Sequence, residues 1–307
     1  MACIIIICML LCSSVNALTE QQKELADAAK REIESLQAEV TRLQKRKDFD
    51  TAIDMLNEAG PKMLKKYGPQ SWPVSEVAMS LADVYAACDC GEAGEAAKLY
   101  EKAIKAKLAI HGERHPMHAA ALERAGDGLT RAGKHKHALR YYKTLVAQVS
   151  AGLGQNHEAS RKTRVKLGDC ALQAKKYQTA ATAYMQVLAN RMPVEEQISA
   201  RMQLSVAQAK AGNLKSALEH AQKACDLSEE HFGKKHMKHA QALNSLAGVL
   251  ERSGQDEAAA RAMEDAATIA AQTYGEGNAM VIEAQRNLNG LRNKIIAKQD
   301  QLSTRRS

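Results

Sequence analysis

The chain has 307 residues, of which 25% are charged and only 4% are aromatic, and its formal net charge is +8. An average charged fraction excludes a wholly disordered chain, and the scarcity of Phe and Trp argues against a large globular enzyme core. The basic residues are spread along the chain instead of gathered with aromatic residues as in a nucleic-acid interface. We therefore expect a helical protein that does not bind nucleic acid.

The first 17 residues have the pattern of a secretory signal peptide. Residues 2–12 form an uncharged apolar run that is roughly half as long as a membrane-spanning helix requires. Val15 and Ala17 occupy the small-residue positions that signal peptidase reads, which predicts cleavage after Ala17. Because no Lys or Arg precedes the run, an uncleaved N-terminal anchor and an incorrectly assigned start are the alternatives.

Residues 18–40 predict an N-terminal helix. Apolar residues in and just after this segment alternate steps of three and four residues, as in a heptad pattern. They are Ile33, Leu36, Val40 and Leu43. So short a pattern is compatible with a dimerising coiled coil, which implies self-association, and with an extended first helix that packs on the rest of the chain.

Residues 41–278 repeat a pattern centred on one alanine. The repeated alanines are separated by 44, 42, 42, 37 and 42 residues, and they are Ala52, Ala96, Ala138, Ala180, Ala217 and Ala259. A Gly or Lys stands five residues before every one of them. A Tyr stands four residues after three of them, at Tyr100, Tyr142 and Tyr184. Such a regular step indicates an internal structural repeat.

Each copy has the elements of a helical hairpin. The Gly or Lys suits the turn between two helices, and small residues about twelve positions before the alanine let the two helices approach closely. One hairpin cannot bury its apolar face alone, so the copies must stack. The predicted fold class is therefore all-α: an α-solenoid of about six stacked helical hairpins. The second copy is lengthened by two residues within 86–90, and the fourth is shortened at 191–193.

The last segment predicts a cap helix over residues 279–300, followed by a charged tail over residues 301–307. Its apolar residues are spaced for one helix face, and they are Val281, Ile282, Leu288, Leu291 and Ile295. A helix of this kind would cover the open end of the final hairpin.

The repeat resembles the tetratricopeptide repeat (TPR), in the 42-residue version found in kinesin light chains. The resemblance is carried by residues 243–254 and by Gly-x-x-His linkers at residues 111–116, 153–157 and 232–236, and it covers roughly residues 40–295. It implies a TPR superhelix whose first helices line a concave groove. That groove would hold a peptide segment or a helix of a partner protein, so the resemblance implies a non-catalytic adaptor or scaffold.

The family pattern places groove-facing side chains at fixed offsets in the first helix of each copy. Carried onto this chain, the groove candidates are Asp83, Glu123, Asp127, Arg131, Lys162, Asp169, Gln173, Lys210, Gln241, Asn244, Arg252 and Arg286. Met79, Met202 and Asn293 occupy further positions of this set. The wall is acidic in its first half and basic or amide-bearing in its second, which predicts a peptide of the opposite charge order.

The sequence contains no recognisable pattern for catalysis, a cofactor or a metal. Histidines gather at residues 135–137 and 231–239, where neighbouring lysines would repel a cation, so we expect solvated turn residues. Neither of the glycine-rich phosphate-binding patterns occurs, and no Ser or Cys nucleophile motif is recognisable. We expect no enzyme activity, no cofactor and no metal site.

Four of the seven cysteines follow the predicted cleavage position. Cys170 and Cys225 fall inside helical repeats at small apolar positions, so we expect them to be buried thiols. Cys88 and Cys90 are the one close pair, and the sequence leaves their redox state open.

These expectations favour a protein-binding adaptor in the secretory pathway, either secreted or delivered to an organelle reached through that pathway. A cytoplasmic location follows if the N-terminal segment is not a functional signal. The alternative functions are a structural subunit of a larger assembly, using the convex face and the N-terminal helix, and a regulatory partner of an enzyme.

Overall fold

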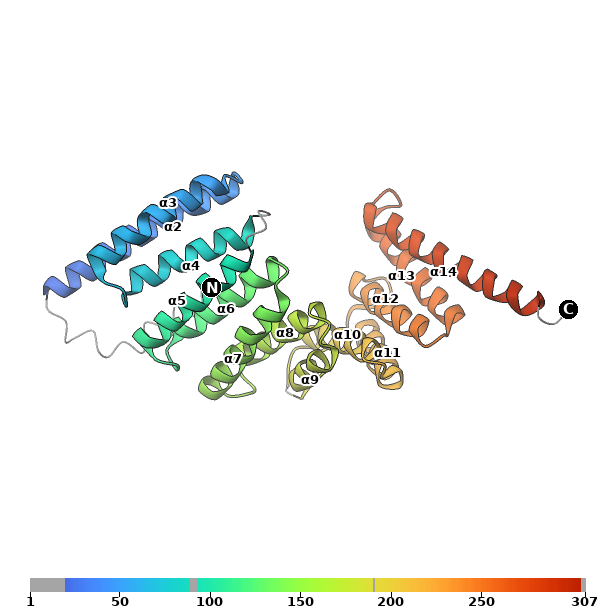
Figure 1. Cartoon of the computed structure of the whole chain (residues 1–307). Helices are drawn as coiled ribbons and strands as arrows, with labels where there is room; N and C mark the ends of the chain where they lie inside the picture. The colour runs from blue at the N-terminus through green and yellow to red at the C-terminus, as the bar shows by residue number, and fades with distance from the viewer. Residues whose placement is uncertain (1–19, 89–92, 190, 305–307) are drawn as a thin grey trace. The chain divides into compact units, whose positions relative to one another are not determined.

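The computed structural model describes residues 20–88, 93–189 and 191–304 (Figure 1). Over these ranges the chain forms thirteen helices and no strand. The predicted signal peptide and its cleavage position, together with Cys90, lie outside the described residues. The prediction of an all-α fold is confirmed.

The helices form six hairpins followed by one further helix. The first helix of each hairpin, called helix A, is α2 (Glu20–Lys45), α4 (Trp72–Ala87), α6 (Pro116–Arg131), α8 (Glu158–Gln173), α10 (Val194–Lys210) or α12 (Met237–Arg252). The second, called helix B, is α3 (Phe49–Tyr67), α5 (Ala93–His111), α7 (His135–Leu153), α9 (Tyr177–Leu188), α11 (Leu214–Phe232) or α13 (Asp256–Tyr274). The chain ends with α14 (Ala279–Thr304). The predicted six helical hairpins are therefore present.

The chain divides into two compact units, Met1–Cys170 and Ala171–Ser307. In the first unit α4 packs against α2, α3, α5 and α6, and α6 packs against α7. In the second unit α10 packs against α9, α11 and α12, and α13 lies between α12 and α14. The division falls in the fourth hairpin, the copy whose shortened step the sequence reveals.

The repeated alanines mark the tightest points of the hairpins. All six have no exposed surface, and they are Ala52, Ala96, Ala138, Ala180, Ala217 and Ala259. Each lies in the first turns of a helix B. A larger side chain at these positions would push a helix away from its neighbours, which explains why alanine returns at this position in every copy.

The turn between helix A and helix B explains the Gly or Lys five residues before five of the repeated alanines; Gly91, before Ala96, lies outside the described residues. Gly133, Gly212 and Gly254 have φ of 70°, 90° and 80°, in the left-handed region. Lys47 and Lys175 adopt the same conformation, with φ of 61° and 57°. A residue with a Cβ atom is strained there by roughly 1–2 kcal/mol, whereas Gly is not.

We expect Lys47→Gly to stabilise the first unit by up to about 1 kcal/mol, because strain relief outweighs the greater freedom of Gly in the unfolded chain. The matched control is Lys30→Gly in the exposed middle of α2, which should cost about 1 kcal/mol. Urea unfolding followed by the fluorescence of Trp72, the single Trp of the chain, reports on this unit. Equal destabilisation by both substitutions would show that strain at Lys47 is negligible.

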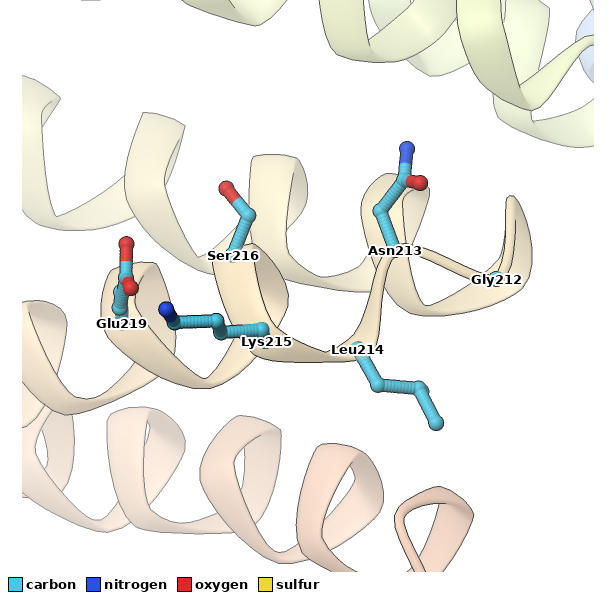
Figure 2. Close-up of a pocket in the computed structure, with 6 residues that line it drawn as sticks. All are labelled: Gly212, Asn213, Leu214, Lys215, Ser216 and Glu219. Carbon is cyan, nitrogen blue, oxygen red and sulfur yellow. The ribbon is translucent and has the colours of Figure 1, made fainter.

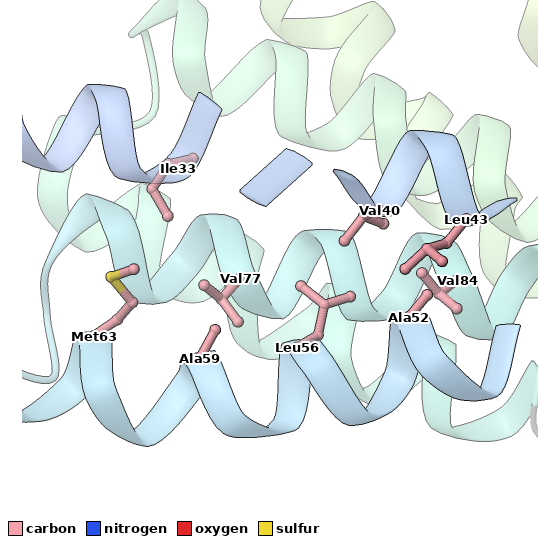
Figure 3. Packing of buried hydrophobic residues seen from close by; sticks show 9 residues of the cluster. All are labelled: Ile33, Val40, Leu43, Ala52, Leu56, Ala59, Met63, Val77 and Val84. Atoms are coloured by element: carbon pink, nitrogen blue, oxygen red, sulfur yellow. The ribbon is translucent and has the colours of Figure 1, made fainter. Parts of the chain in front are cut away.

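The apolar edge of α2 is buried within the first unit. Val40 and Leu43 point toward Leu56 of α3 and Val84 of α4, whereas Ile33 points toward Met63 and Val77 (Figure 3). All of these side chains are at most 6% exposed. The heptad-like pattern therefore packs inside the chain, as the alternative of an extended first helix requires. The helix runs unbroken through residue 40, where the sequence predicted the start of the array, and ends at Lys45.

The second unit is packed largely by alanines. Its core cluster includes Ala217, Ala221 and Ala224 of α11, all with no exposed surface, against Ala242 and Val249 of α12. Small side chains allow the helix axes to approach closely. Many weak van der Waals contacts then take the place of contacts made by a few large side chains.

The cap helix α14 buries Val281, Leu288 and Leu291, as the sequence predicts, whereas Ile282 is 46% exposed. It continues to Thr304, four residues past the predicted boundary at residue 300. Residues 301–304 contain no Gly or Pro that would end a helix.

Candidate protein-binding site

The A helices lie next to one another within each unit, and they carry the predicted groove residues. In the first unit α4 contacts both α2 and α6, and in the second α10 contacts α12. The outward side chains of these helices therefore share one side of each unit. Several of these side chains are used inside the unit itself, which decides what remains for a partner.

A network of charged side chains is buried where α4 meets α5 and α6. The carboxylate of Glu76, whose side chain is 9% exposed, pairs with Lys107, whose side chain is 2% exposed. Arg124 of α6 donates to Glu76 Oε2 at 3.0 Å and, through Nε, to Asp83 Oδ2 at 2.5 Å. Gln37 of α2 also donates to Glu76, at 3.2 Å. The network joins α2, α4, α5 and α6.

The ionisation of this network is fixed by its geometry. Burial would raise the pKa of Glu76, but the charges of Lys107 and Arg124 outweigh burial and hold the pKa below its ordinary value of 4.5. Burial likewise opposes the charge of Arg124, yet Asp83 and Glu76 raise its pKa. Glu76 and Arg124 are therefore both charged at neutral pH.

We expect Glu76→Gln to destabilise the first unit by about 3–5 kcal/mol at pH 7, because it leaves Lys107 buried without its counter-charge. Since the pKa of Glu76 is lowered in the folded state, its contribution is full above pH 4.5 and is lost as the pH falls through the folded value. The difference between the two proteins should therefore shrink below pH 4.5 when urea unfolding is followed by Trp72 fluorescence. The control is Glu113→Gln at an exposed site of the same unit, expected within about 0.5 kcal/mol of the parent. A difference that is independent of pH would contradict the assignment.

Two repeated tyrosines reach back to aspartates of their own hairpins. Tyr100 donates to Asp83 Oδ1 at 2.5 Å, and Tyr142 donates to Asp127 Oδ1 at 2.6 Å. Burial and the neighbouring carboxylate raise the pKa of Tyr100. A Cβ atom on Gly128 would overlap the Tyr100 hydroxyl, so this glycine is what admits the ring.

The acidic groove candidates of the first unit are therefore partly neutralised. Asp83 has 19% of its side chain exposed and pairs with Arg124. Glu123 and Asp127 both accept from Lys166 Nζ at 2.8 Å, and they keep 28% and 42% of their side chains exposed. The further candidate Met79 has no exposed surface, so its predicted place in a groove wall was wrong. Its position faces the core because helices pack on both sides of α4.

The remaining candidates are exposed. Lys162 pairs with Glu158 one turn away at 2.5 Å, and Lys210 lies 5.8 Å from the ring centre of Tyr177. The exposed candidates are Arg131, Lys162, Asp169, Gln173, Lys210, Gln241, Asn244, Arg252 and Arg286. Five of the nine lie on α10, α12 and α14, in the second unit.

The histidines of the inter-hairpin linkers have a role that the sequence analysis missed. Nδ1 of His115 accepts from the backbone N–H of Met117 at 3.1 Å, and His157 and His236 make the same contact two residues ahead. They cap the start of a helix A. His118 and His239 are buried, so the expectation of a solvated turn residue was wrong for His239, whereas His137, His231 and His236 are exposed. The equal spacing from the preceding Gly was the available signal.

The cysteines agree with the sequence analysis. Cys170 and Cys225 are free and buried, as predicted, and burial raises the pKa of the Cys225 thiol to about 12. Such a thiol is unreactive at neutral pH. Cys88 takes part in a disulfide, which answers the redox question that the sequence left open for this residue.

A surface hollow lies beside the turn from α10 to α11. Figure 2 shows that its lining comes from one short stretch of backbone, Gly212–Ser216, and from Glu219. None of the predicted groove residues lines it. Within the described ranges, no helix is long and apolar enough to cross a membrane.

Residues 196–288, which span most of α10 through the first part of α14, match the family model of the tetratricopeptide repeat. This segment is built of tetratricopeptide repeats. The predicted resemblance is confirmed over these residues, and it is the segment that contains Gln241, Asn244 and Arg252.

Two curated proteins are similar in sequence to the repeat chain. A secreted RxLR effector protein, RXLR-C07 of Plasmopara halstedii, is 26% identical over 216 residues, which are 68% of this chain and 66% of that protein. The RxLR effector protein SFI4 of Phytophthora infestans is 28% identical over 193 residues, which are 59% of this chain and 55% of that protein. The chain thus spans two thirds or less of the length of these relatives.

Solved structures of repeat proteins are also similar. Kinesin light chain nearly identical TPR-like repeats from Podosopora anserina share 16% identity over 79% of this chain and 97% of that chain, with a TM-score of 0.46. BtubC from P. vanneervenii shares 17% identity over 70% of this chain and 94% of that chain, with a TM-score of 0.49.

Proposed function

We propose that the protein is a non-catalytic protein-binding module whose tetratricopeptide repeats hold a peptide segment of a partner on the A helices of the second unit. The observation that carries this proposal is the outward face of α12. Gln241, Asn244, Gly248 and Arg252 are all exposed on it. Their steps of three and four residues place them on one face of the helix. Proteins with this repeat generally act by binding other proteins.

The chemistry of this face suits an extended peptide with acidic side chains. The amides of Gln241 and Asn244 can each donate to a peptide carbonyl and accept from a peptide N–H. Gly248 leaves room between them and Arg252, because a Cβ atom there would meet nothing within 4 Å. Arg252, Lys210 and the more distant Arg286 supply positive charge. The first-unit candidates add little acidic charge, since Arg124 and Lys166 offset it.

We expect the double variant Gln241→Ala/Asn244→Ala to weaken a bound peptide about tenfold or more, through the loss of hydrogen bonds worth about 0.5–1.5 kcal/mol each. The peptide would be chosen from a random display library against the purified protein, and its affinity would be measured by fluorescence anisotropy. Both positions are exposed, so thermal unfolding should be unchanged.

The matched control for this experiment is Lys223→Ala/Glu230→Ala on α11, a helix B of the same unit with both residues exposed. An equal loss of peptide affinity in both double variants would refute binding on the face of α12. Unchanged affinity in both variants would refute it as well. Failure of every peptide to bind the parent protein would count against peptide recognition altogether.

We also propose that the chain is a secreted effector that acts on proteins outside its cell of origin. The support is the name of one relative, a secreted RxLR effector, together with the signal-like segment before Ala17. N-terminal sequencing of protein recovered from the medium of a secreting host should give a chain that begins at Leu18. Substituting Ala17 by Arg should block cleavage, because the peptidase needs a small residue there. A mature chain that begins at Met1 would refute the proposal.

A further inference from the structure

The helix α7 and the turn before it differ in charge from the rest of the chain. The protein contains 35 acidic residues in 307, yet residues 128–157 contain none. The same stretch contains five cations, and they are Arg131, Lys134, Lys136, Arg140 and Lys143. We call these five residues the basic face. All five are exposed.

The cations of α7 lie together on its outer side. Lys136, Arg140 and Lys143 are separated by steps of four and three residues, which place them on one face of the helix over about two turns. Lys134 is the N-cap residue of α7, and Arg131 is the last residue of α6, one turn away along the chain. The basic face thus covers the α6–α7 turn and the first half of α7.

The basic face is little neutralised by the protein itself. Arg140 lies 3.9 Å from Glu101, at the limit of an ion pair, and within the described part of the chain the other four cations have no ion pair. On the neighbouring helix α5, by contrast, Lys98 and Lys105 pair with carboxylates on their own helix at 2.7 and 2.9 Å.

Two of these cations, Lys134 and Lys136, also stand at the unfavourable end of a helix, the N-terminus of α7. A helix N-terminus carries partial positive charge, so cations near it destabilise the helix, and an anion brought close would be stabilising. The helix B of the first hairpin shows the usual solution, since Asp48 caps α3 by accepting from Thr51 N–H. Lys134 provides no such cap for α7. The cations at the N-terminus of α7 therefore lower the folding stability of this helix. A carboxylate supplied by a partner would offset that loss.

The side chains around the basic face favour a protein partner over other polyanions. Tyr141 and Tyr142 are only 7% and 3% exposed, so neither offers a ring on which a base could stack. The next exposed positions of α7 are Thr144 and Ala147, which give a membrane nothing large and apolar to hold. We propose that the basic face of α7 binds an acidic segment of a partner protein. It lies on a helix B of the first unit, so it is separate from the proposed peptide site on α12.

The test uses the full chain and a fluorescent peptide in which Asp and Glu alternate with Gly and Ser. We expect Lys136→Gln/Arg140→Gln/Lys143→Gln to weaken its binding about tenfold at about 0.15 M salt. The matched control is Lys45→Gln/Arg46→Gln/Lys65→Gln, which removes the same charge from exposed sites on α2, its following turn and α3. It should change binding less than about twofold. The basic-face variant should also unfold at the same or a higher temperature, because all three sites are exposed and Lys136 has left the first turn of α7.

Each other outcome overturns the proposal. Equal weakening in both variants would mean that net charge alone attracts the peptide. Unchanged binding of the basic-face variant would place the site elsewhere. Tighter, basic-face-dependent binding of single-stranded DNA, or of vesicles containing phosphatidylserine, would assign the surface to nucleic acid or to a membrane. Because the face of α12 also suits acidic peptides, the measurement is repeated in the Gln241→Ala/Asn244→Ala background. Loss of the three basic-face cations should weaken binding there by the same factor, whether or not the α12 face binds a peptide. An effect of the basic-face variant that disappears in this background would contradict a separate site on α7.

Discussion

The buried carboxylate of Glu76 contacts Lys107 of α5 and Arg124 of α6, and these contacts determine how three helices of the first unit must pack. Removing both an anion and a cation from water costs several kcal/mol per ion, and their attraction repays that cost only in good geometry. Lys107 has 2% of its side chain exposed, so it has no access to water as an alternative. A helix that slides by one turn would leave a buried charge unpaired.

The same requirement explains the close approach of α5 and α6. Tyr100 must pass the backbone of α6 at Gly128 to donate to Asp83, and Asp83 is also held by Arg124. Glycine inside a helix costs about 1 kcal/mol relative to Ala. Here that cost is offset by the hydrogen bond and the packing that it permits. The core cluster of the second unit consists instead largely of alanine contacts, which are less directional.

The positions of the alanines and of the A–B turns could be predicted because they depend on the local sequence. Lys175, for example, stands five residues before Ala180 and takes the left-handed conformation of the A–B turn. That conformation depends on the turn itself and not on how the hairpins stack. The environment of Asp83 could not be predicted in this way. Its partner Arg124 is 41 residues further along the chain, and only the packing of α4 against α6 brings them together. The burial of Met79 could not be predicted either, because it depends on how many helices pack around α4. The position of Met79 within the repeat gives no information on that number.

The distribution of charge follows from this packing. The first half of the groove wall is predicted to be acidic if Asp83, Glu123 and Asp127 are counted as free carboxylates. Once each is paired with Arg124 or Lys166, little net negative charge is left there. The cations of α7 are not offset in this way, because that helix carries no acidic residue. Both proposed sites therefore favour acidic ligands, the one through the cations of α7 and the other through Lys210, Arg252 and Arg286.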